Sequence, residues 1–318
     1  MSRCVISWSA DENRESRKKD MTKKIAVIND LSGFGKCSLT AAISAIAAMG
    51  VQPCPLPTAV LSAQTGYPSY YCDDYTDRME LIYKEWEKIQ VHFDGIYTGF
   101  MAGGHQIRKV LDFLDAFYKK DTFLVVDPVM GDNGNRYPIF TPELVAEMKS
   151  LVSRADIITP NLTELCLLTG TDYHMIKVMT EEKQLVTVAE QMARNLMTGG
   201  TKEVLVTGIR FADEESGEEM MGNLAVTKGG VSFSAFPFIG ESFSGTGDLF
   251  ASVVAGGRAR GDSLADTMKL AGEMIERAIR DSVKNNVPRN DGVDYEKYLW
   301  MLGEKNREAF KEEAVSGK

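Results

Sequence analysis

The sequence has few of the residues that would indicate secretion or metal binding. Its 318 residues include only five cysteines, Cys4, Cys37, Cys54, Cys72 and Cys166, with no CxxC pair. This odd and scattered set argues against a disulfide framework and a structural zinc site, and it favours a reducing, cytoplasmic location. The three histidines are isolated along the chain, so a histidine-based metal site is not expected.

Long apolar runs and an excess of positive charge are also missing. No stretch of about 18 apolar residues is present, so no membrane span is expected. The chain has 36 basic and 45 acidic residues, a net charge of -9 that disfavours a nucleic-acid partner. Residues 1–22 are polar and mixed in charge, which predicts a flexible leader. We expect one domain over residues 23–303 and a helical tail at 304–318.

Short apolar runs alternate with segments of helical character. Strands are predicted at 24–29, 57–62, 95–98, 123–126, 156–159 and 203–207, with a hairpin formed by 220–227 and 231–236. Helices are predicted at 38–49, 77–91, 106–118, 142–152, 162–168, 185–197, 246–258 and 263–284, and again after Asp294. This alternation predicts an α/β fold with a mostly parallel sheet and helices on both faces.

Polar residues stand just after several predicted strands. In open parallel sheets, ligands bind beyond the carboxyl ends of the strands. Any one of these residues is equally consistent with a turn or a helix cap, but their recurrence at six strand ends favours a site. They are Asp30, Ser32, Thr65, Thr98, Asp127, Thr159, Asn161 and Thr207.

Residues 243–250 read F-S-G-T-G-D-L-F and lead into an alanine-rich helix. Gly245 and Gly247 allow close backbone approach, and the N-terminus of a helix presents free N–H groups, so this turn is suited to an anion. Asp248 falls in the first helical turn. It either complements the helix dipole or acts as the general base of a phosphoryl transfer.

Two further segments place acids at strand ends. Asp127-Pro128-Val129-Met130-Gly131-Asp132 has two carboxylates suited to Mg²⁺, although a solvated Pro/Gly turn is the alternative. Glu164, which follows Thr159-Pro160-Asn161, either orients metal-bound water or caps a helix.

The glycines of residues 33–37, G-F-G-K-C, do not complete a familiar nucleotide motif. A Walker A loop needs a glycine where this chain has Asp30 and a serine or threonine where it has Cys37. The third glycine of a dinucleotide fingerprint is replaced by Ser38, which disfavours a nicotinamide enzyme.

Together these segments resemble the ribokinase-like superfamily of small-molecule kinases, and most closely its pyridoxal/pyridoxamine (vitamin B6) kinases, over residues 24–287. The resemblance implies a three-layer α/β/α sandwich and a homodimer. It also implies ATP and Mg²⁺ as cofactors, and leaves a monovalent cation open. S-G-T-G-D at 244–248 resembles the superfamily's anion-hole signature, so the catalytic base corresponds to Asp248. The anion-hole amides correspond to Gly245, Thr246 and Gly247.

D-P-V-M-G-D-N-G at 127–134 resembles the phosphate and metal loop of the vitamin B6 kinases. This similarity implies Asp127 and Asp132 near Mg²⁺ and ATP, and a mobile flap at residues 133–137, from Asn133 to Tyr137. A-D-I-I-T-P-N at 155–161 resembles a second metal-and-phosphate segment, and the strand end at 206–208 an ATP contact. These two segments add Asn161, Glu164, Thr207 and Gly208 as ATP-binding residues, with Glu164 also near the metal.

S-A-Q-T-G-Y at 62–67 resembles the segment that touches the pyridine ring, which implies a substrate contact at Thr65. Phe100 stands where the family usually has tyrosine. Asp30 and Ser32 belong to N-D-L-S-G-F-G at 29–35, which is more similar to the opening of hydroxymethylpyrimidine kinases. We include both as substrate-binding residues, with ring selectivity open.

The resemblance implies a kinase that phosphorylates the 5′-hydroxymethyl group of pyridoxal, pyridoxine or pyridoxamine. Three alternatives stay open. The first is a hydroxymethylpyrimidine (phosphate) kinase. The second is a sugar or nucleoside kinase, disfavoured because no two-glycine sugar signature stands near the start. The third is a non-catalytic sensor of vitamin B6 or nucleotide, against which the intact G-T-G-D and both acidic segments argue.

Overall fold

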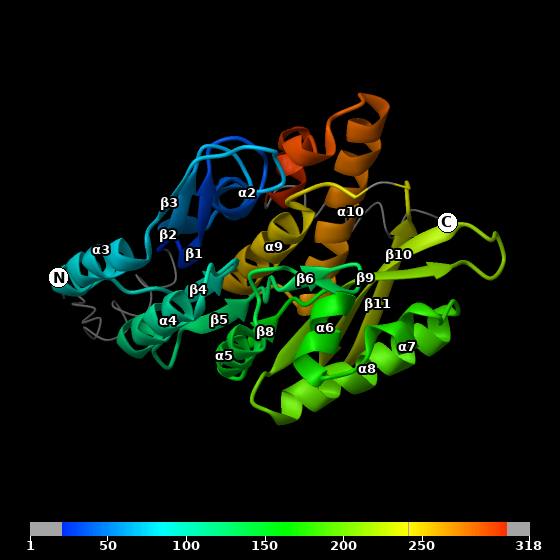
Figure 1. Ribbon diagram of the computed structural model, residues 1–318, viewed down its shortest axis with the longest axis horizontal. Helices are drawn as coiled ribbons and strands as arrows, with labels where there is room; N and C mark the ends of the chain where they lie inside the picture. The colour runs from blue at the N-terminus through cyan, green and yellow to red at the C-terminus, as the bar shows by residue number, and fades with distance from the viewer. Residues whose placement is uncertain (1–20, 241, 304–318) are drawn as a thin grey trace, which may run out of the picture.

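The structure, a computed structural model, describes residues 21–240 and 242–303 (Figure 1). The leader predicted at 1–22, apart from Met21 and Thr22, and the helical tail predicted at 304–318 lie outside the described residues. Within the described ranges, no helix is long and apolar enough to cross a membrane. The four cysteines described there, Cys37, Cys54, Cys72 and Cys166, are free thiols.

A nine-stranded sheet forms the centre of the molecule (Figure 1). Its strands, in spatial order, are β11 (Gly230–Pro237), β10 (Glu219–Thr227), β9 (Glu203–Ala212), β8 (Ile157–Ile158), β5 (Phe123–Val126), β4 (Gly95–Thr98), β1 (Lys24–Ser32), β2 (Gln52–Leu61) and β3 (Cys72–Asp74). The strands from β9 to β2 run parallel, while β10, β11 and β3 pair antiparallel. The prediction of a mostly parallel sheet is confirmed.

Helices cover both faces of this sheet, which makes three layers (Figure 1). One face packs against α2 (Ser38–Ala48), α9 (Thr246–Arg260), α10 (Leu264–Lys284) and the 3-10 segment η2 (Tyr295–Leu302). The other packs against α3 (Thr76–Lys88), α4 (Gly104–Phe117), α5 (Pro142–Val152), α6 (Leu162–Thr169), α7 (Tyr173–Lys177) and α8 (Glu182–Thr198). A further 3-10 turn, η1 (Arg289–Asp291), precedes η2.

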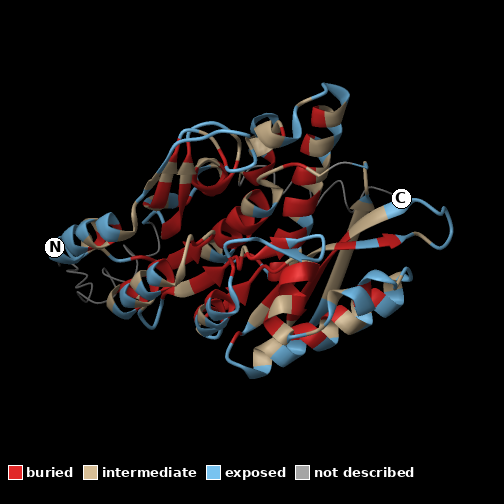
Figure 2. Cartoon of the chain, in the orientation of Figure 1, coloured by how far each residue is buried: buried red, intermediate tan, exposed pale blue. Residues whose placement is uncertain are grey.

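The central strand β1 shows why its sequence reads as one apolar run. Ile25 and Val27 belong to the core beneath α2 and α9, whereas Ala26 and Ile28 belong to the core on the opposite face. All four are completely buried (Figure 2). A parallel strand covered on both faces needs apolar side chains at successive positions, and the strand was predicted from this pattern.

Strand β2 begins at Gln52, five residues before the predicted start. Three prolines do not interrupt this strand: Pro53, Pro55 and Pro57. They alternate with the residues whose backbone N–H groups point toward β1. The Gln52 N–H donates to the Lys23 carbonyl at 2.8 Å, so the proline nitrogens point to the other side, where β3 pairs only with residues 59–61. Prolines are tolerated where no ladder bond is lost.

Strand β9 continues to Ala212 instead of ending at Thr207. The register with β10 shifts at this point, since Val206 pairs with Leu224 and Ile209 with Gly222. Gly208 adopts a φ of +72°, which a bulge with an extra residue requires. The glycine that marked the predicted strand end is therefore a bulge inside a longer strand.

The connections from β1 onward change side: β2 lies on one side of β1, and β4 lies on the other. The crossover helix α2 packs on one face of the sheet, and the later helices α3 and α4 pack on the opposite face. In α/β sheets the crevice at such a switch point is where ligands bind. The carboxyl ends of β1 and β4 are therefore where a site is expected.

Candidate active site

Helix α9 begins beside the start of α2. Its N-cap, Gly245, has a φ of +82° and lies so close to the Lys36–Cys37 backbone that a Cβ there would collide with the Lys36 carbonyl oxygen. A glycine is therefore required on both conformational and steric grounds. Thr246 donates its hydroxyl to the Phe243 carbonyl at 3.1 Å, while Gly247 is exposed. This turn leaves the first N–H groups of α9 free for an anion.

Asp248 is partly buried in the first turn of α9. Asn29 Nδ2 donates to Asp248 Oδ1 at 3.1 Å, and the backbone N–H of Ser38 also hydrogen-bonds to this carboxylate. Burial and the charge of Asp30 outweigh these two donors and raise the pKa of Asp248 to about 6. A carboxylate with this pKa is ionised at pH 7 yet close enough to neutrality to accept a proton.

Asp127 follows β5 and is buried beside this carboxylate. Its Oδ1 accepts from the Thr159 hydroxyl at 3.0 Å. Burial, followed by the negative charge of Asp248, raises the pKa of Asp127 to about 8. The two predicted acids are thus brought within electrostatic reach of each other from positions 121 residues apart in sequence. A bound cation would relieve their repulsion.

Glu164 closes a capping box at the start of α6. Its Oε2 accepts from the Asn161 N–H at 2.8 Å, and the Asn161 side chain accepts from the Glu164 N–H at 2.9 Å. Glu164 Oε1 accepts from the Met130 N–H at 3.0 Å, so it also holds the loop after β5. The capping alternative from the sequence is therefore present. Burial and the charge of Asp127 still raise the pKa of Glu164 well above its usual value.

The predicted flap is a small β-hairpin. Strands β6 (Gly131–Asp132) and β7 (Asn135–Arg136) are joined by Asn133 and Gly134, with φ values of +52° and +80°. Two positive φ values in an Asn-Gly pair are typical of a type I′ turn, so the pair was a readable signal that the sequence analysis passed over. Asp132 is exposed and accepts two hydrogen bonds from Asn133 at 2.8 Å.

The hairpin is anchored over the acids. Asn161 Nδ2 donates to the Gly131 carbonyl at 2.8 Å, and the Gly134 N–H donates to the Thr163 hydroxyl at 2.8 Å. Burial and the surrounding carboxylates, Glu164 first among them, raise the pKa of Tyr137. Thr207 joins this edge through a parallel bridge to Asn161, and Gly208 follows it in the β9 bulge.

Three of the predicted substrate residues are joined to Asn29, the partner of Asp248, directly or through one another: Asp30, Ser32 and Phe100. Asp30 and Ser32 are buried at the end of β1, where the Ser32 hydroxyl donates to Asp30 Oδ2 at 2.9 Å. Phe100 is half-buried after β4, and its N–H donates to Asn29 Oδ1 at 3.0 Å. Thr65 is exposed on a loop that Gln64 anchors by donating to the Asn290 carbonyl at 3.0 Å.

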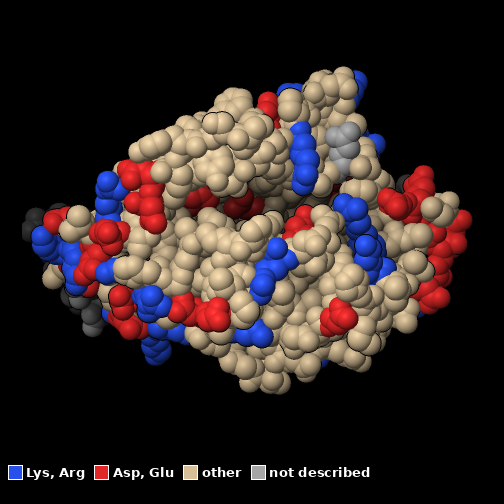
Figure 3. Space-filling model, viewed as in Figure 1, with Lys and Arg blue, Asp and Glu red and all other residues tan. Residues whose placement is uncertain are grey.

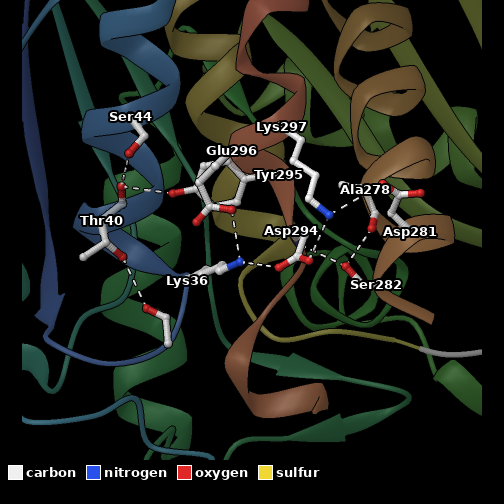
Figure 4. Close-up of polar contacts among 11 residues, drawn as sticks. Lys36, Thr40, Ser44, Ala278, Asp281, Ser282, Asp294, Tyr295, Glu296 and Lys297 are labelled. Carbon is white, nitrogen blue, oxygen red and sulfur yellow. Dashed lines mark hydrogen bonds and ion pairs between the residues drawn. The ribbon is translucent and has the colours of Figure 1, made fainter. Parts of the chain in front are cut away.

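One residue that the sequence does not mark, Asn29, organises this site, and a second, Lys36, is engaged elsewhere. Asn29 bridges Asp248 to the ends of β1 and β4, although it reads only as the last residue of an apolar strand. Lys36 pairs with Asp294 at 2.7 Å and with Glu296 at 3.0 Å (Figure 4). That placement agrees with the rejection of a Walker A loop.

Acidic side chains gather in the hollow across the middle of the face in Figure 3, and basic side chains flank it. Within the described residues, no group of three or more His, Cys, Asp or Glu forms a ready metal cage. A separate cavity of about 300 Å³ is lined by Asp74, Thr76, Asp77, Ala102, Gly103, His105 and Gln106, which include none of the predicted site residues.

The family model for phosphomethylpyrimidine kinase matches residues 35–292. This chain belongs to the phosphomethylpyrimidine kinase family. Its fold is that of the ribokinase-like kinases, as the resemblance implied. A Bacteroides thetaiotaomicron protein that carries the name phosphomethylpyrimidine kinase, crystallised with pyridoxal, is 38% identical. The alignment covers 89% of this chain and 96% of that one, with a TM-score of 0.80.

Two solved pyridoxal kinases have the same fold as this chain. The Lactobacillus plantarum enzyme is 28% identical over 89% of this chain and 97% of its own, with a TM-score of 0.77. The Leishmania donovani enzyme, solved with ADP and pyridoxine, is 21% identical over 88% and 95% of the two chains, with a TM-score of 0.73.

Proposed function

We propose that this protein is an ATP-dependent kinase that phosphorylates the 5′-hydroxymethyl group of pyridoxal, pyridoxine or pyridoxamine. The observation that carries the proposal is the position of Asp248, which has a pKa of about 6, at an anion-binding helix N-terminus and within electrostatic reach of Asp127. As part of the same proposal, we expect a cytoplasmic homodimer.

In the proposed reaction, Asp248 accepts the proton of the substrate hydroxyl. The alkoxide oxygen forms a bond to the γ-phosphorus as the bond from that phosphorus to the bridging oxygen of ADP breaks. Free N–H groups of Gly245, Thr246 and Gly247 stabilise the charge on the transferring group. Because phosphoryl transfer needs little covalent help, positioning and electrostatics supply most of the acceleration.

The nucleotide would lie along the edge formed by Asn161, Thr207 and Gly208. There the β9 bulge exposes backbone groups, and the β6–β7 hairpin covers the acids. A hairpin closed over the phosphates would exclude water and limit ATP hydrolysis. Asn133 and Tyr137 are its contacts toward the nucleotide in this proposal.

The donor set fits Mg²⁺. Asp127 and Glu164 are buried carboxylates, and the charge of Asp127 raises the pKa of Glu164. Mg²⁺ takes oxygen ligands and uses few protein groups beside water and phosphate. Asp127 would hold it, with Asp132 and Glu164 orienting its water. When bound, the ion neutralises charge on the phosphate oxygens.

The pyrimidine alternative has its own observation. Asp30 and Ser32 form a buried, hydrogen-bonded pair at the substrate side, in the D-x-S-G form that resembles pyrimidine kinases. The likeness to a pyridoxal-bound protein and to pyridoxal kinases, together with the G-D-N-G hairpin, favours vitamin B6.

A coupled kinase assay with pyridoxal, pyridoxine, pyridoxamine and hydroxymethylpyrimidine decides between the two readings. We expect the highest kcat/KM for a B6 vitamer, and no turnover with the Asp248→Asn variant. A higher kcat/KM for the pyrimidine would overturn the B6 assignment. Binding of vitamer without ADP release would indicate a sensor, and turnover only with sugars or nucleosides would indicate the remaining alternative.

A further inference from the structure

Asn29 is completely buried at the carboxyl end of β1, next to the switch point of the sheet. Its Oδ1 accepts two backbone N–H groups, from Asp30 and from Phe100, each at 3.0 Å. Its Nδ2 donates to Asp248 Oδ1 at 3.1 Å. One side chain thus joins two strand ends on the proposed substrate side to the proposed base.

The orientation of this amide is fixed by its partners. Two N–H donors require an acceptor, and a carboxylate at neutral pH requires a donor, so the oxygen faces Asp30 and Phe100 while the nitrogen faces Asp248. A flipped amide would place oxygen against oxygen and nitrogen against two N–H groups. The donor to Asp248 is therefore built into the fold.

The neighbouring chain is shaped around this amide. Gly99 follows β4, and a Cβ at that position would collide with Asn29 Nδ2. The Gly99 N–H donates to the Ile28 carbonyl at 2.9 Å, which holds the β4 end against β1. Glycine here leaves space for the amide, so the close approach of the two strand ends depends on both residues.

We propose that Asn29 is the positioning residue of Asp248: its amide orients the carboxylate and ties it to the substrate side of the site. The proposal deepens the proposed function, because it takes Asp248 as the base of that reaction. Asn29 acts through Asp248 and through the backbone of Asp30 and Phe100.

Several groups influence the same carboxylate. From β1, Asp30 raises the pKa of Asp248, while the Asn29 amide and, from α2, the Ser38 N–H lower it. The charge of Asp248 in turn acts on other groups that face the same space: Cys37, Tyr97, Asp127 and Tyr137. Removing the Asn29 donor therefore leaves Asp248 with fewer groups that favour its charge, and its pKa rises.

The sharpest test is Asn29→Asp. This variant keeps an oxygen for the N–H groups of Asp30 and Phe100, and it replaces the donor to Asp248 with a second carboxyl group, which repels the Asp248 carboxylate or shares its proton. We expect kcat to fall by about 10- to 100-fold, the usual cost of a misplaced group. The KM for ATP should stay within about twofold, and the acid limb of the kcat/KM profile should move to higher pH, which shrinks the deficit between pH 6 and pH 9.

Asn29→Ala, which removes both functions, should lose at least as much activity and also lower the Tm. Thr122→Ala is the matched control, since Thr122 is buried, donates its hydroxyl to the Phe93 carbonyl at 2.9 Å and lies at the amino end of β5, opposite to the end that carries the site. We expect it to lower the Tm with kcat unchanged. Wild-type kcat in Asn29→Asp, or an equal loss at every pH, would show that Asn29 only supports the loops and would overturn the proposal.

A readout without substrate separates this proposal from the proposed function. The carboxyl carbon of Asp248, assigned by its absence in Asp248→Asn, can be titrated by ¹³C NMR in the unliganded protein. We expect a higher pKa in Asn29→Ala, which removes the donor without adding a charge, than in the wild type, and an unchanged pKa would contradict the proposed role. If the wild type phosphorylates no vitamer, the B6 function fails, while this titration still decides the role of Asn29.

Discussion

Replacing Asp248 with asparagine tests the chemistry and the energetics of the candidate site together. The substitution keeps the size of the side chain and still offers an oxygen to the Asn29 amide, which donates at 3.1 Å. It removes the proton acceptor and one negative charge. Loss of a well-placed general base costs about 10²–10⁴ in rate, so we expect kcat to fall by that factor with nucleotide binding retained.

The same variant should be more stable than the wild type at neutral pH. The fold raises the pKa of Asp248 from 3.8 to about 6, mainly by burial. A raised acid pKa means that ionisation costs stability. The cost is absent below the unfolded pKa, grows as the pH rises, and is complete above the folded pKa. At about 1.4 kcal/mol per pKa unit, the upper limit is about 3 kcal/mol at pH 8, and about half of that at pH 5.

An amide is a poorer acceptor than a carboxylate for the Asn29 and Ser38 donors, so part of this gain is lost. We expect a net gain of about 1–2 kcal/mol at pH 8, which for a domain of this size raises the Tm by about 2–6 °C. The assay pairs kcat at saturating ATP and pyridoxal with Tm from calorimetry at pH 8 and pH 5. Wild-type kcat would refute the base assignment, and an equal Tm gain at both pH values would refute the electrostatic reasoning.

Three further substitutions probe the framework of the site. Gly245→Ala should cost at least about 2 kcal/mol of unfolding free energy and most of the activity, because it adds strain and a clash with the Lys36–Cys37 backbone that precedes α2. Gly261→Ala, at a φ of +85° with open space around it, should cost about 1 kcal/mol with normal kcat. Lys36→Met should leave the KM for ATP unchanged and lower stability by no more than about 1 kcal/mol, since the partly exposed ion pairs of this lysine are structural; a large rise in that KM would restore a phosphate role. Thr159→Val should raise the KM for ATP at limiting Mg²⁺ by about tenfold, because the lost hydrogen bond favours the charged form of Asp127; an unchanged KM would separate Asp127 from the metal.

The fold was predictable where burial alone determines the sequence. Strands such as β1 and β5 are covered on both faces, and their apolar runs marked them within a few residues. Departures occurred where backbone geometry overrides composition. The alternate prolines of β2 face an open edge, and Gly208 makes a bulge in β9 instead of ending it. Neither distinction can be read without knowing the neighbouring strand.

The acids of the site were predictable because parallel topology brings strand ends together. Asp127 and Asp248 were found from their motifs, and the structure places each within the other's field. Of the partners that hold them, Thr159 was among the predicted strand-end residues, whereas Asn29 was not. In the sequence, Asn29 reads as part of the apolar strand. The contact of Gln64 with Asn290, which anchors the loop of Thr65, joins positions 226 residues apart. No local sequence pattern indicates either role.

The charge of the candidate site limits what it can bind. Asp30, Asp127, Glu164 and Asp248 come from four separate chain segments, and burial is the leading cause that raises the pKa of each. In all but Asp30, the charge of another acid of the group adds to that shift. Such a group opposes an uncompensated polyphosphate, because like charges at short range in a poorly solvated site repel strongly. A nucleotide can therefore enter only with cations, or with protons on the acids. In the proposed reaction Asp248 must stay ionised to accept the substrate proton, so the compensation would have to act on Asp127 and Glu164. The proposed division between a base next to the substrate and acids next to the phosphates is the one that electrostatics favours, and the sheet would maintain it because each acid is fixed to a different strand end or helix N-terminus.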